Sequence, residues 1–158
     1  TLPGESYSTI IRDSRLWMAV QPSGGHSDLI SIGNGKGILV ERNFIDGVSV
    51  TGGGNVSATM QIMPNPGVTG AGTMIFRNNL WTSDGTGTFF NIGKTNATSG
   101  CASNVQFHDN VFDMNSTGSF INYNSDDKAC SQISTEDCTG NTHLDSGLPA
   151  DCSPDGFP

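Results

Sequence analysis

The chain has 158 residues and a formal net charge of −8 at pH 7. This negative charge argues against a nucleic-acid partner or an anionic membrane surface. No stretch is long and apolar enough to span a bilayer, so we expect no membrane insertion. The 21 Gly and 14 Asn residues suit turns and stacked side chains rather than helices, and the length suits one domain.

An eleven-residue pattern occurs three times, at residues 37–47, 73–83 and 104–114. Each copy carries a marker asparagine at its seventh position. The markers Asn43, Asn79 and Asn110 are 36 and 31 residues apart, and a further step of 31 reaches Asn141. A repeat at this period indicates structural units that stack on one another.

Short runs of alternating apolar and polar residues accompany the repeats, at residues 30–32, 60–62, 90–92 and 121–123. Such alternation predicts strands with one buried face. Each period then holds two or three short strands separated by turns, and no window shows helical periodicity. The pattern predicts an all-β, parallel β-helix of about five coils. An ordinary β-sandwich is the alternative, although it does not require equal spacing.

In this arrangement the four marker asparagines form an internal ladder, with each amide hydrogen-bonded to its neighbour one coil away. The same register predicts four inward apolar columns, which are Ile38, Met74 and Val105; Val40, Phe76 and Phe107; Ile45, Trp81 and Phe112; and Ile30, Met60, Phe90 and Ile121.

We expect the coils to occupy residues 1–141 and a capping tail to occupy residues 142–158. Strand edges at the start of the stack need cover, which predicts an upstream segment or a partner subunit there.

The register also pairs the four cysteines. Cys101 and Cys130 fall in the same turn of successive coils, at a spacing that a disulfide can bridge. Cys138 lies in an inward column, and Cys152 in the tail is its remaining partner. Four free thiols are the alternative. Disulfides and acidity together predict an extracellular location, secreted or at the cell surface.

Three sequons mark Asn55, Asn96 and Asn115 as candidate glycosylation sites. Their number equals what chance predicts for this composition, so they are compatible with a secreted glycoprotein without establishing one.

The pattern Val-x-Phe-x-x-Asn-x-Phe at residues 105–112, its variants, and the Gly-Thr-Phe-Phe-Asn-Ile run at residues 87–92 resemble the right-handed parallel β-helix superfamily. Its members include pectate lyases, polygalacturonases, alginate-modifying enzymes and phage tailspikes. The resemblance covers about residues 9 to 141. It implies a right-handed, single-stranded helix, and it specifies architecture better than activity.

Enzymes of this superfamily typically carry acidic residues on one outer strand face. The equivalent column here is Ser31, Gln61, Asn91 and Asn122, which contains no carboxylate. The hydrolase motifs and the calcium-binding aspartate cluster of the resembling enzymes have no evident match. A glycosidase needs two carboxylates across the scissile bond, and this column does not supply them.

A second outer column, Glu41, Arg77 and His108, is charged. It could supply a base and a charge-neutralising arginine for β-elimination of a uronate sugar. On that hypothesis the catalytic candidates are Arg77, His108 and Asp113. The structural alternative is a solvated cross-strand ion pair.

Asp46, Asp84 and Asp113 follow the ladder positions and form a loose acidic group. They could bind calcium, but Asp is also a common turn residue. We therefore expect no resident cofactor, with Ca²⁺ left as an open alternative.

The neutral column of Gln61, Asn91 and Asn122 has the more suggestive neighbours. If these amides point outward, so do Leu29, Thr59, Phe89 and Phe120, which places two aromatic residues one coil apart beside a row of amides. Such a face suits sugar rings, a protein partner or a covering loop.

Three functional classes follow. The first is an extracellular structural or adhesive module that contacts polysaccharide or a partner subunit. The second is a polysaccharide lyase or glycoside hydrolase that acts on an acidic polysaccharide. The third is an architectural fibre segment stacked end to end. The neutral outer column favours the first class.

Overall fold

The computed structural model describes residues 7–17, 28–33, 37–47, 58–62, 73–83, 88–92, 104–114, 121–123 and 137–152. These residues form fourteen β-strands. In chain order the strands are β1 Thr9–Arg12, β2 Arg15–Trp17, β3 Asp28–Ile32, β4 Ile38–Glu41, β5 Phe44–Gly47, β6 Ala58–Ile62, β7 Met74–Arg77, β8 Leu80–Ser83, β9 Thr88–Ile92, β10 Val105–His108, β11 Val111–Met114, β12 Ile121–Tyr123, β13 Cys138–Thr139 and β14 Thr142–His143.

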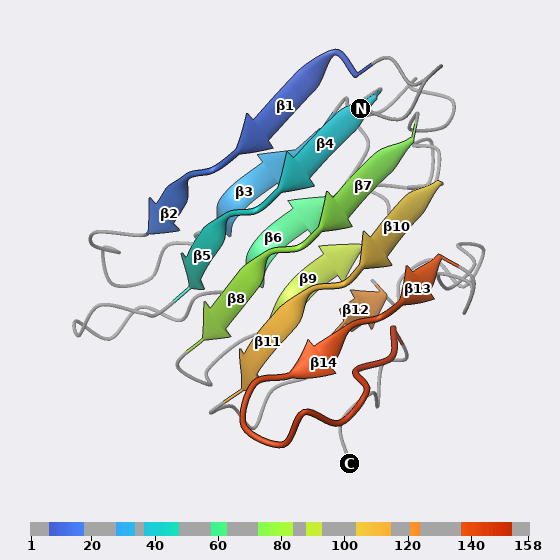
Figure 1. Ribbon diagram of the computed structural model, residues 1–158. Helices are drawn as coiled ribbons and strands as arrows, with labels where there is room; N and C mark the ends of the chain where they lie inside the picture. The colour runs from blue at the N-terminus through green and yellow to red at the C-terminus, as the bar shows by residue number, and fades with distance from the viewer. Residues whose placement is uncertain are drawn as a thin grey trace.

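The strands form three sheets in which neighbouring strands are parallel. Sheet A has the order β1-β4-β7-β10-β13, sheet B the order β2-β5-β8-β11-β14, and sheet C the order β3-β6-β9-β12. The chain passes through sheets A, B and C in turn and then returns to the next strand of sheet A. We call each passage a layer. The first layer (β1–β3) and the fifth (β13 and β14) lie at opposite ends of the stack (Figure 1).

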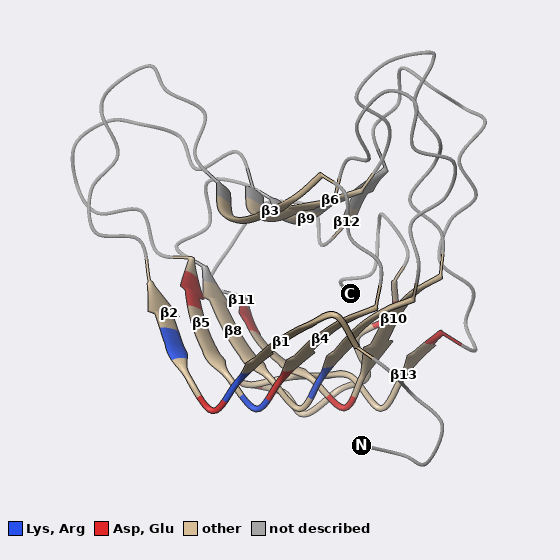
Figure 2. Cartoon of the chain, turned by 90° about the horizontal axis from the view of Figure 1, so that it is seen from above, with Lys and Arg blue, Asp and Glu red and all other residues tan. Residues whose placement is uncertain are grey.

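Viewed from above, sheets A and B form the two arms of a bent wall, and sheet C faces them (Figure 2). The residue at the bend has a positive φ angle in every layer. These residues are Asp13, Arg42, Asn78, Asp109 and Gly140. Gly, Asn and Asp tolerate this left-handed conformation, whereas it is uncommon for Arg. The bend turns the chain so that the next residue, a marker asparagine or Ser14, begins the passage into sheet B.

The marker asparagines are buried and hydrogen-bonded to one another, as the sequence predicts. Oδ1 of Asn110 accepts hydrogen bonds from the backbone N–H of Asn79 (3.1 Å) and from its Nδ2 (3.0 Å). Nδ2 of Asn110 donates to the backbone carbonyl of Phe76 (2.9 Å). The same pattern joins Asn43 to Asn79 and Asn110 to Asn141. Each buried asparagine amide thus finds its hydrogen-bond partners on the corresponding asparagine of the next layer.

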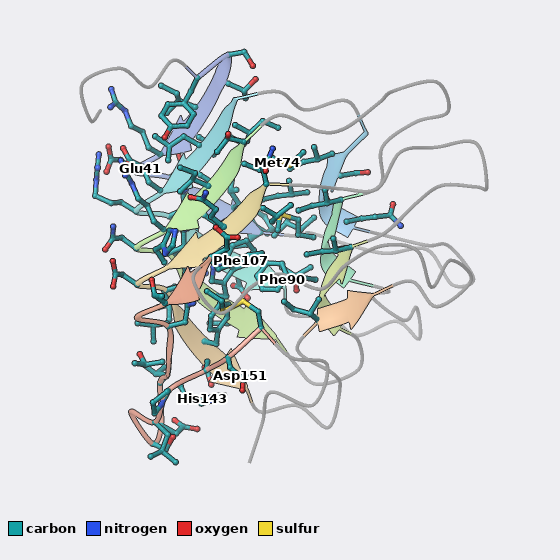
Figure 3. All side chains as sticks on the ribbon, turned by 90° about the vertical axis from the view of Figure 1, so that its right-hand side faces the viewer. Glu41, Met74, Phe90, Phe107, His143 and Asp151 are labelled. Atoms are coloured by element: carbon teal, nitrogen blue, oxygen red, sulfur yellow. A yellow bond between two sulfur atoms is a disulfide. The ribbon has the colours of Figure 1, made fainter. Side chains whose placement is uncertain are left out.

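The core lies between the bent wall and sheet C, where the four predicted apolar columns are in register. Phe90 of sheet C stands at its centre. Its ring centroid is 4.5 Å from Phe107 of sheet A and 4.8 Å from Trp81 of sheet B. Figure 3 shows Phe90 and Phe107 between the walls. One side chain therefore ties all three sheets together.

The predicted disulfide between Cys138 and Cys152 is present, with a Cα–Cα distance of 5.9 Å. It holds the tail against the fifth layer. The N–H of Ala150 donates to the carbonyl of Asn141 (2.9 Å), and an antiparallel bridge joins Thr142 to Pro149. Ala150 and Cys152 are buried by this contact.

The predicted pair Cys101–Cys130 and the sequon residues Asn55, Asn96 and Asn115 lie outside the described residues. Within the described part of the chain, no helix is long and apolar enough to cross a membrane.

The two residues Leu29 and Thr59, which the sequence predicts on the outward face, are not both accessible: Thr59 is buried, and Leu29 is partly buried and packs against the core. The reason is a corner at which strands of sheet B and sheet C approach one another. Gly47 ends β5 there, and a Cβ on Gly47 would collide with the Thr59 hydroxyl. The Thr59 side chain therefore fills the corner instead of facing solvent.

Candidate functional site

A network of charged side chains lies on the outside of the bend between sheets A and B (Figure 2). Glu41 is in register with Arg77, which is in register with His108. Oε2 of Glu41 accepts a hydrogen bond from Nε of Arg77 (3.0 Å) and lies 2.9 Å from Nη2 of the same arginine. Oε1 of Glu41 lies 3.0 Å from Nη1 of Arg42. Arg42 also donates two hydrogen bonds to Asp13, from Nε to Oδ1 (2.7 Å) and from Nη2 to Oδ2 (2.8 Å).

The charges in this network neutralise one another. Burial alone would raise the pKa of Glu41, but the Arg77 hydrogen bond and the charges of Arg42 and Arg77 lower it below its ordinary value. The Arg42 hydrogen bond likewise lowers the pKa of Asp13. A general base works best with a pKa near the operating pH. Glu41 therefore has the chemistry of a structural anion rather than of a base.

The structure contains the cross-strand ion pair of the structural alternative, formed by Glu41 and Arg77. The pair is not solvated as that alternative predicts, because Glu41 is only 6% exposed. Its partner Arg77 is only partly exposed, so the pair lies largely within the surface layer. A charge-assisted hydrogen bond in such a place contributes more than an exposed pair.

We expect Glu41→Gln to lower the free energy of unfolding by about 1.5–3 kcal/mol at pH 7, because Arg77 loses a charge-assisted bond. The folded-state pKa of Glu41 is lowered, so its contribution is complete above the ordinary value of 4.5 and is lost as the pH falls through the folded-state pKa. Chemical denaturation at pH 7 and at about pH 3 measures both effects.

Asp13→Asn is the matched control, since Asp13 pairs with Arg42, which Glu41 also contacts, but is exposed. Its effect at pH 7 is expected to be clearly smaller than that of Glu41→Gln. Equal effects of the two variants, or a Glu41→Gln deficit that persists unchanged in acid, would contradict the buried-anion account.

Of the three catalytic candidates, two are neighbours. Arg77 and His108 are in register on adjacent strands of sheet A. Nδ1 of His108 lies 2.8 Å from the Thr139 hydroxyl, and Nε2 lies 3.4 Å from Oε1 of Gln106. The third candidate, Asp113, belongs to β11 of sheet B, beyond the bend. The register thus brings Arg77 and His108 together and places Asp113 on a different sheet.

The acidic group is also split. Asp46, Thr82 and Asp113 are in register on β5, β8 and β11, so a threonine stands between the two acids. Oδ1 of Asp46 accepts a hydrogen bond from the Thr82 hydroxyl (3.0 Å), and Oδ2 pairs with Arg15 (3.3 Å). Asp84 lies outside the described residues. Within the described ranges, no three His, Cys, Asp or Glu side chains are grouped as a metal site would require.

His143 of β14 lies beneath the tail, close to Asp151 (Figure 3). Burial lowers the pKa of His143, and the negative charge of Asp151 opposes that shift. His143 thus favours its neutral form at neutral pH. It continues the inward column of sheet B, in register with Phe112, which is a structural position.

The neutral column lies on sheet C. Ser31, Gln61, Asn91 and Asn122 are in register across all four strands. Ser31 is exposed and Gln61 is half-buried. Adjacent strands are about 4.8 Å apart, so the residues that carry the carboxamide groups recur at that interval across the sheet. Each amide offers a donor and an acceptor.

The aromatic candidates beside this row are described only in part. The structure describes the backbone of Phe89 within β9, and Phe120 lies outside the described residues. The expected aromatic pair beside the amides therefore stays a prediction.

Three structural residues escaped the sequence reasoning. Ser14 holds the first ladder position, where its N–H donates to Oδ1 of Asn43 (3.0 Å). Arg42 and Asp13 join successive layers at the bend. All three could have been found from their distance to the marker asparagines. Ser14 occupies a ladder position, and Asp13 and Arg42 occupy the position immediately before one, where each repeat has a residue of positive φ.

Comparison with protein-family models, with curated proteins and with solved structures finds no match.

Proposed function

We propose that the chain is a single right-handed parallel β-helix of about five coils, in which each layer is one coil, and that it belongs to the pectate-lyase-like and tailspike-like superfamily. The parallel pairing of every neighbouring strand and the hydrogen-bonded asparagines support this architecture. The Cys138–Cys152 disulfide supports an oxidising, extracellular location, secreted or at the cell surface.

The proposed function is that of a structural or adhesive module that contacts polysaccharide or a partner subunit through sheet C. The observation that carries it is the in-register row of Ser31, Gln61, Asn91 and Asn122. A row of neutral hydrogen-bonding groups at a regular interval matches the hydroxyl groups that recur along a glycan. Neutral amides also bind sugar hydroxyls without the desolvation cost of a charge.

The charged bend supports a binding role over a catalytic one. Glu41 and Arg77 satisfy each other, and the lowered pKa of Glu41 makes it a weak base. Sheet C, by contrast, presents uncharged side chains at the described positions Ser31 and Gln61.

A polysaccharide panel tests this proposal by affinity electrophoresis, in which bound protein is retarded by soluble polysaccharide in the gel. We expect retardation by at least one polysaccharide and at least about a tenfold loss of affinity in Gln61→Ala and Asn91→Ala. Phe89→Ala and Phe120→Ala test the aromatic part of the face in the same gels.

Gln106→Ala is the matched control, because Gln106 is a half-buried glutamine on the outer side of sheet A. It is expected to bind like the unmodified chain. Absence of retardation across acidic and neutral polysaccharides would count against the glycan proposal, as would an equal loss in Gln106→Ala.

The register of Arg77 with His108 favours one second candidate, a lyase or hydrolase acting on an acidic polysaccharide. Incubation with uronate-containing polysaccharides would then produce unsaturated uronate absorbance or new reducing ends. That activity should disappear in His108→Ala and Arg77→Ala, with Asp113→Ala as the third variant.

A further inference from the structure

The segment that follows the fifth layer is anchored at both of its ends. It begins directly after His143, the last residue of β14, and it leads to Cys152, which the disulfide joins to Cys138 of β13. We call residues 144–151 the strap. Both anchors belong to the fifth layer, so a strap that leaves the end of the stack stays attached to it.

The strap stands where a sixth layer would pair with sheet B. In the middle of the stack, the residue after each ladder position donates its N–H to the ladder residue of the layer before. These bonds run from Leu80 to Asn43, from Val111 to Asn79 and from Thr142 to Asn110. Ala150 of the strap donates the equivalent bond to the carbonyl of Asn141 (2.9 Å). The strap therefore covers the outer edge of β14.

Backbone hydrogen bonds rather than packed side chains hold the strap in place. Every strap residue except Ala150 is exposed. The N–H of His143 donates to the carbonyl of Leu148 (2.9 Å), and the carbonyl of His143 accepts from the N–H of Gly147 (2.8 Å). A segment that buries little apolar surface opens at a small cost in free energy. A single change at the base of the strap can therefore decide whether it is closed.

His143 is a titratable side chain at that base. It is 8% exposed and continues the inward column of sheet B, in register with Phe112. A neutral imidazole is compatible with this position, whereas an imidazolium ion loses hydration there. An open strap returns the ring to water and removes this penalty.

Asp151 is the charged group of the strap that acts on His143. It lies close to His143 (Figure 3), and its negative charge favours the protonated ring. On the neighbouring strand β11, the residue in register with His143 is the uncharged Phe112. Two further acids of these segments lie outside the inward column, namely Asp113 and Asp145. Asp151 is thus the described charge that compensates a proton on His143.

We propose that residues 144–151 form an acid-opened strap, which covers the end of sheet B at neutral pH and lifts from it when the His143 imidazole takes up a proton. The open strap remains tethered through Cys152, so a return to neutral pH closes it again. This device belongs to the fifth layer and is independent of glycan binding by sheet C.

The pH range of opening follows from the environment of the ring. Burial lowers the pKa of His143 in the closed strap, against the opposing charge of Asp151, below the ordinary value of 6.5. Above that value the ring is neutral in both forms, and the strap keeps its full stability. As the pH falls below 6.5, the open form binds the proton more readily. The opening constant then rises until the pH reaches the pKa of the closed form.

Hydrogen exchange of single amides, measured by NMR on the full 158-residue chain without polysaccharide, tests the proposal. The N–H of Ala150 reports on the strap. After correction for the intrinsic pH dependence of exchange, its opening constant should rise at least about threefold between about pH 7.5 and pH 5. The ordinary pKa of 6.5 limits the rise to about thirtyfold. The rise should reverse when the sample is returned to about pH 7.5.

The N–H of Val111, which donates to Asn79 between two middle layers, is the matched control. Its opening constant should change by less than about twofold over the same pH range. His143→Phe keeps an aromatic ring in the column but cannot take up a proton, so the Ala150 opening constant should lose its pH dependence. Asp151→Asn removes the compensating charge and should enlarge the rise in acid.

An Ala150 opening constant that is the same at both pH values would overturn the proposal. So would a pH dependence that persists in His143→Phe, or one that Asp151→Asn leaves unchanged. A parallel rise at Val111 would show that acid loosens the whole stack rather than the strap, and it would overturn the proposal as well. Because no polysaccharide is present, each of these results leaves the binding test of sheet C unaffected.

Discussion

Asn110→Asp is expected to lower the free energy of unfolding by about 3–5 kcal/mol at pH 7, the cost of an uncompensated buried charge. Asn110 is fully buried in the ladder. The change replaces Nδ2, which donates to the carbonyl of Phe76 and to Oδ1 of Asn141, by an oxygen that faces both acceptors. Two favourable hydrogen bonds become two repulsions, while the shape of the side chain is kept.

The pH dependence of this variant follows from the same geometry. Burial raises the pKa of the introduced carboxyl above its unfolded value of about 3.9. The deficit relative to the unmodified chain should therefore be smallest below the unfolded pKa and grow as the pH rises through the folded pKa. Denaturant titrations at about pH 3, 5 and 7 follow this change.

Asn78→Asp is the matched control, since Asn78 adjoins the ladder but is exposed. Its positive φ of 54° is one that Asp accepts. We expect a change within about 0.5 kcal/mol, as for most surface substitutions. If Asn110→Asp were as mild as Asn78→Asp at pH 7, the ladder would not be a buried hydrogen-bonded structure.

Phe90→Ala is expected to lower the free energy of unfolding by about 3–5 kcal/mol. The Phe90 ring is fully buried and contacts aromatic rings of both other sheets. Removing the ring leaves a cavity between the three sheets. The hydrogen-bonded strands are rigid, so the sheets cannot move together to fill that cavity. Thermal and denaturant unfolding, monitored by circular dichroism, provide the measurement.

Phe44→Ala removes the same group from the outer side of sheet B. Phe44 is partly exposed, and the Arg15 guanidinium stacks 5.0 Å from its ring centroid. We expect Phe44→Ala to cost clearly less than Phe90→Ala, because only partial burial and one cation–π contact are lost. An equal cost for the two variants would show that Phe90 is not the centre of the core.

The interior could be predicted from sequence because repetition determines it. Once residues 43, 79, 110 and 141 are aligned, alternation assigns each neighbouring residue an inward or outward position. The apolar columns and the inward position of Cys138 follow from that register, and the structure places them accordingly. Cys152 was assigned to Cys138 as the remaining cysteine, and the structure contains that disulfide. No knowledge of side-chain packing was needed.

The bends and corners could not be predicted in the same way. The bond between Arg42 and Asp13 depends on a positive φ at both residues, and Arg gives no sequence signal for that conformation. The burial of Thr59 depends on how closely sheets B and C approach at Gly47. Alternation of apolar and polar residues assigns side chains to the two faces of a strand. It does not say which side chains become buried where two sheets meet at a corner.

The sequence predicted which residues of the candidate site lie in one column, but it did not predict their burial or their hydrogen-bond partners. The sequence placed Glu41, Arg77 and His108 in one column, and the register agrees. It did not reveal that Glu41 is buried and held by Arg42 as well as by Arg77. Asp113 was grouped with Arg77 and His108 by sequence, although the bend places it on another sheet.

The most direct test of the proposed binding function is an NMR titration of the side-chain amide groups with the polysaccharide that gives the strongest retardation. The proposal predicts saturable shifts in the amide signals of Gln61, Asn91 and Asn122. The buried ladder amides of Asn79 and Asn110 should stay in place as internal references. Shifts confined to residues around Arg77 and His108, or no shifts at saturating polysaccharide, would contradict the assignment of sheet C as the binding face.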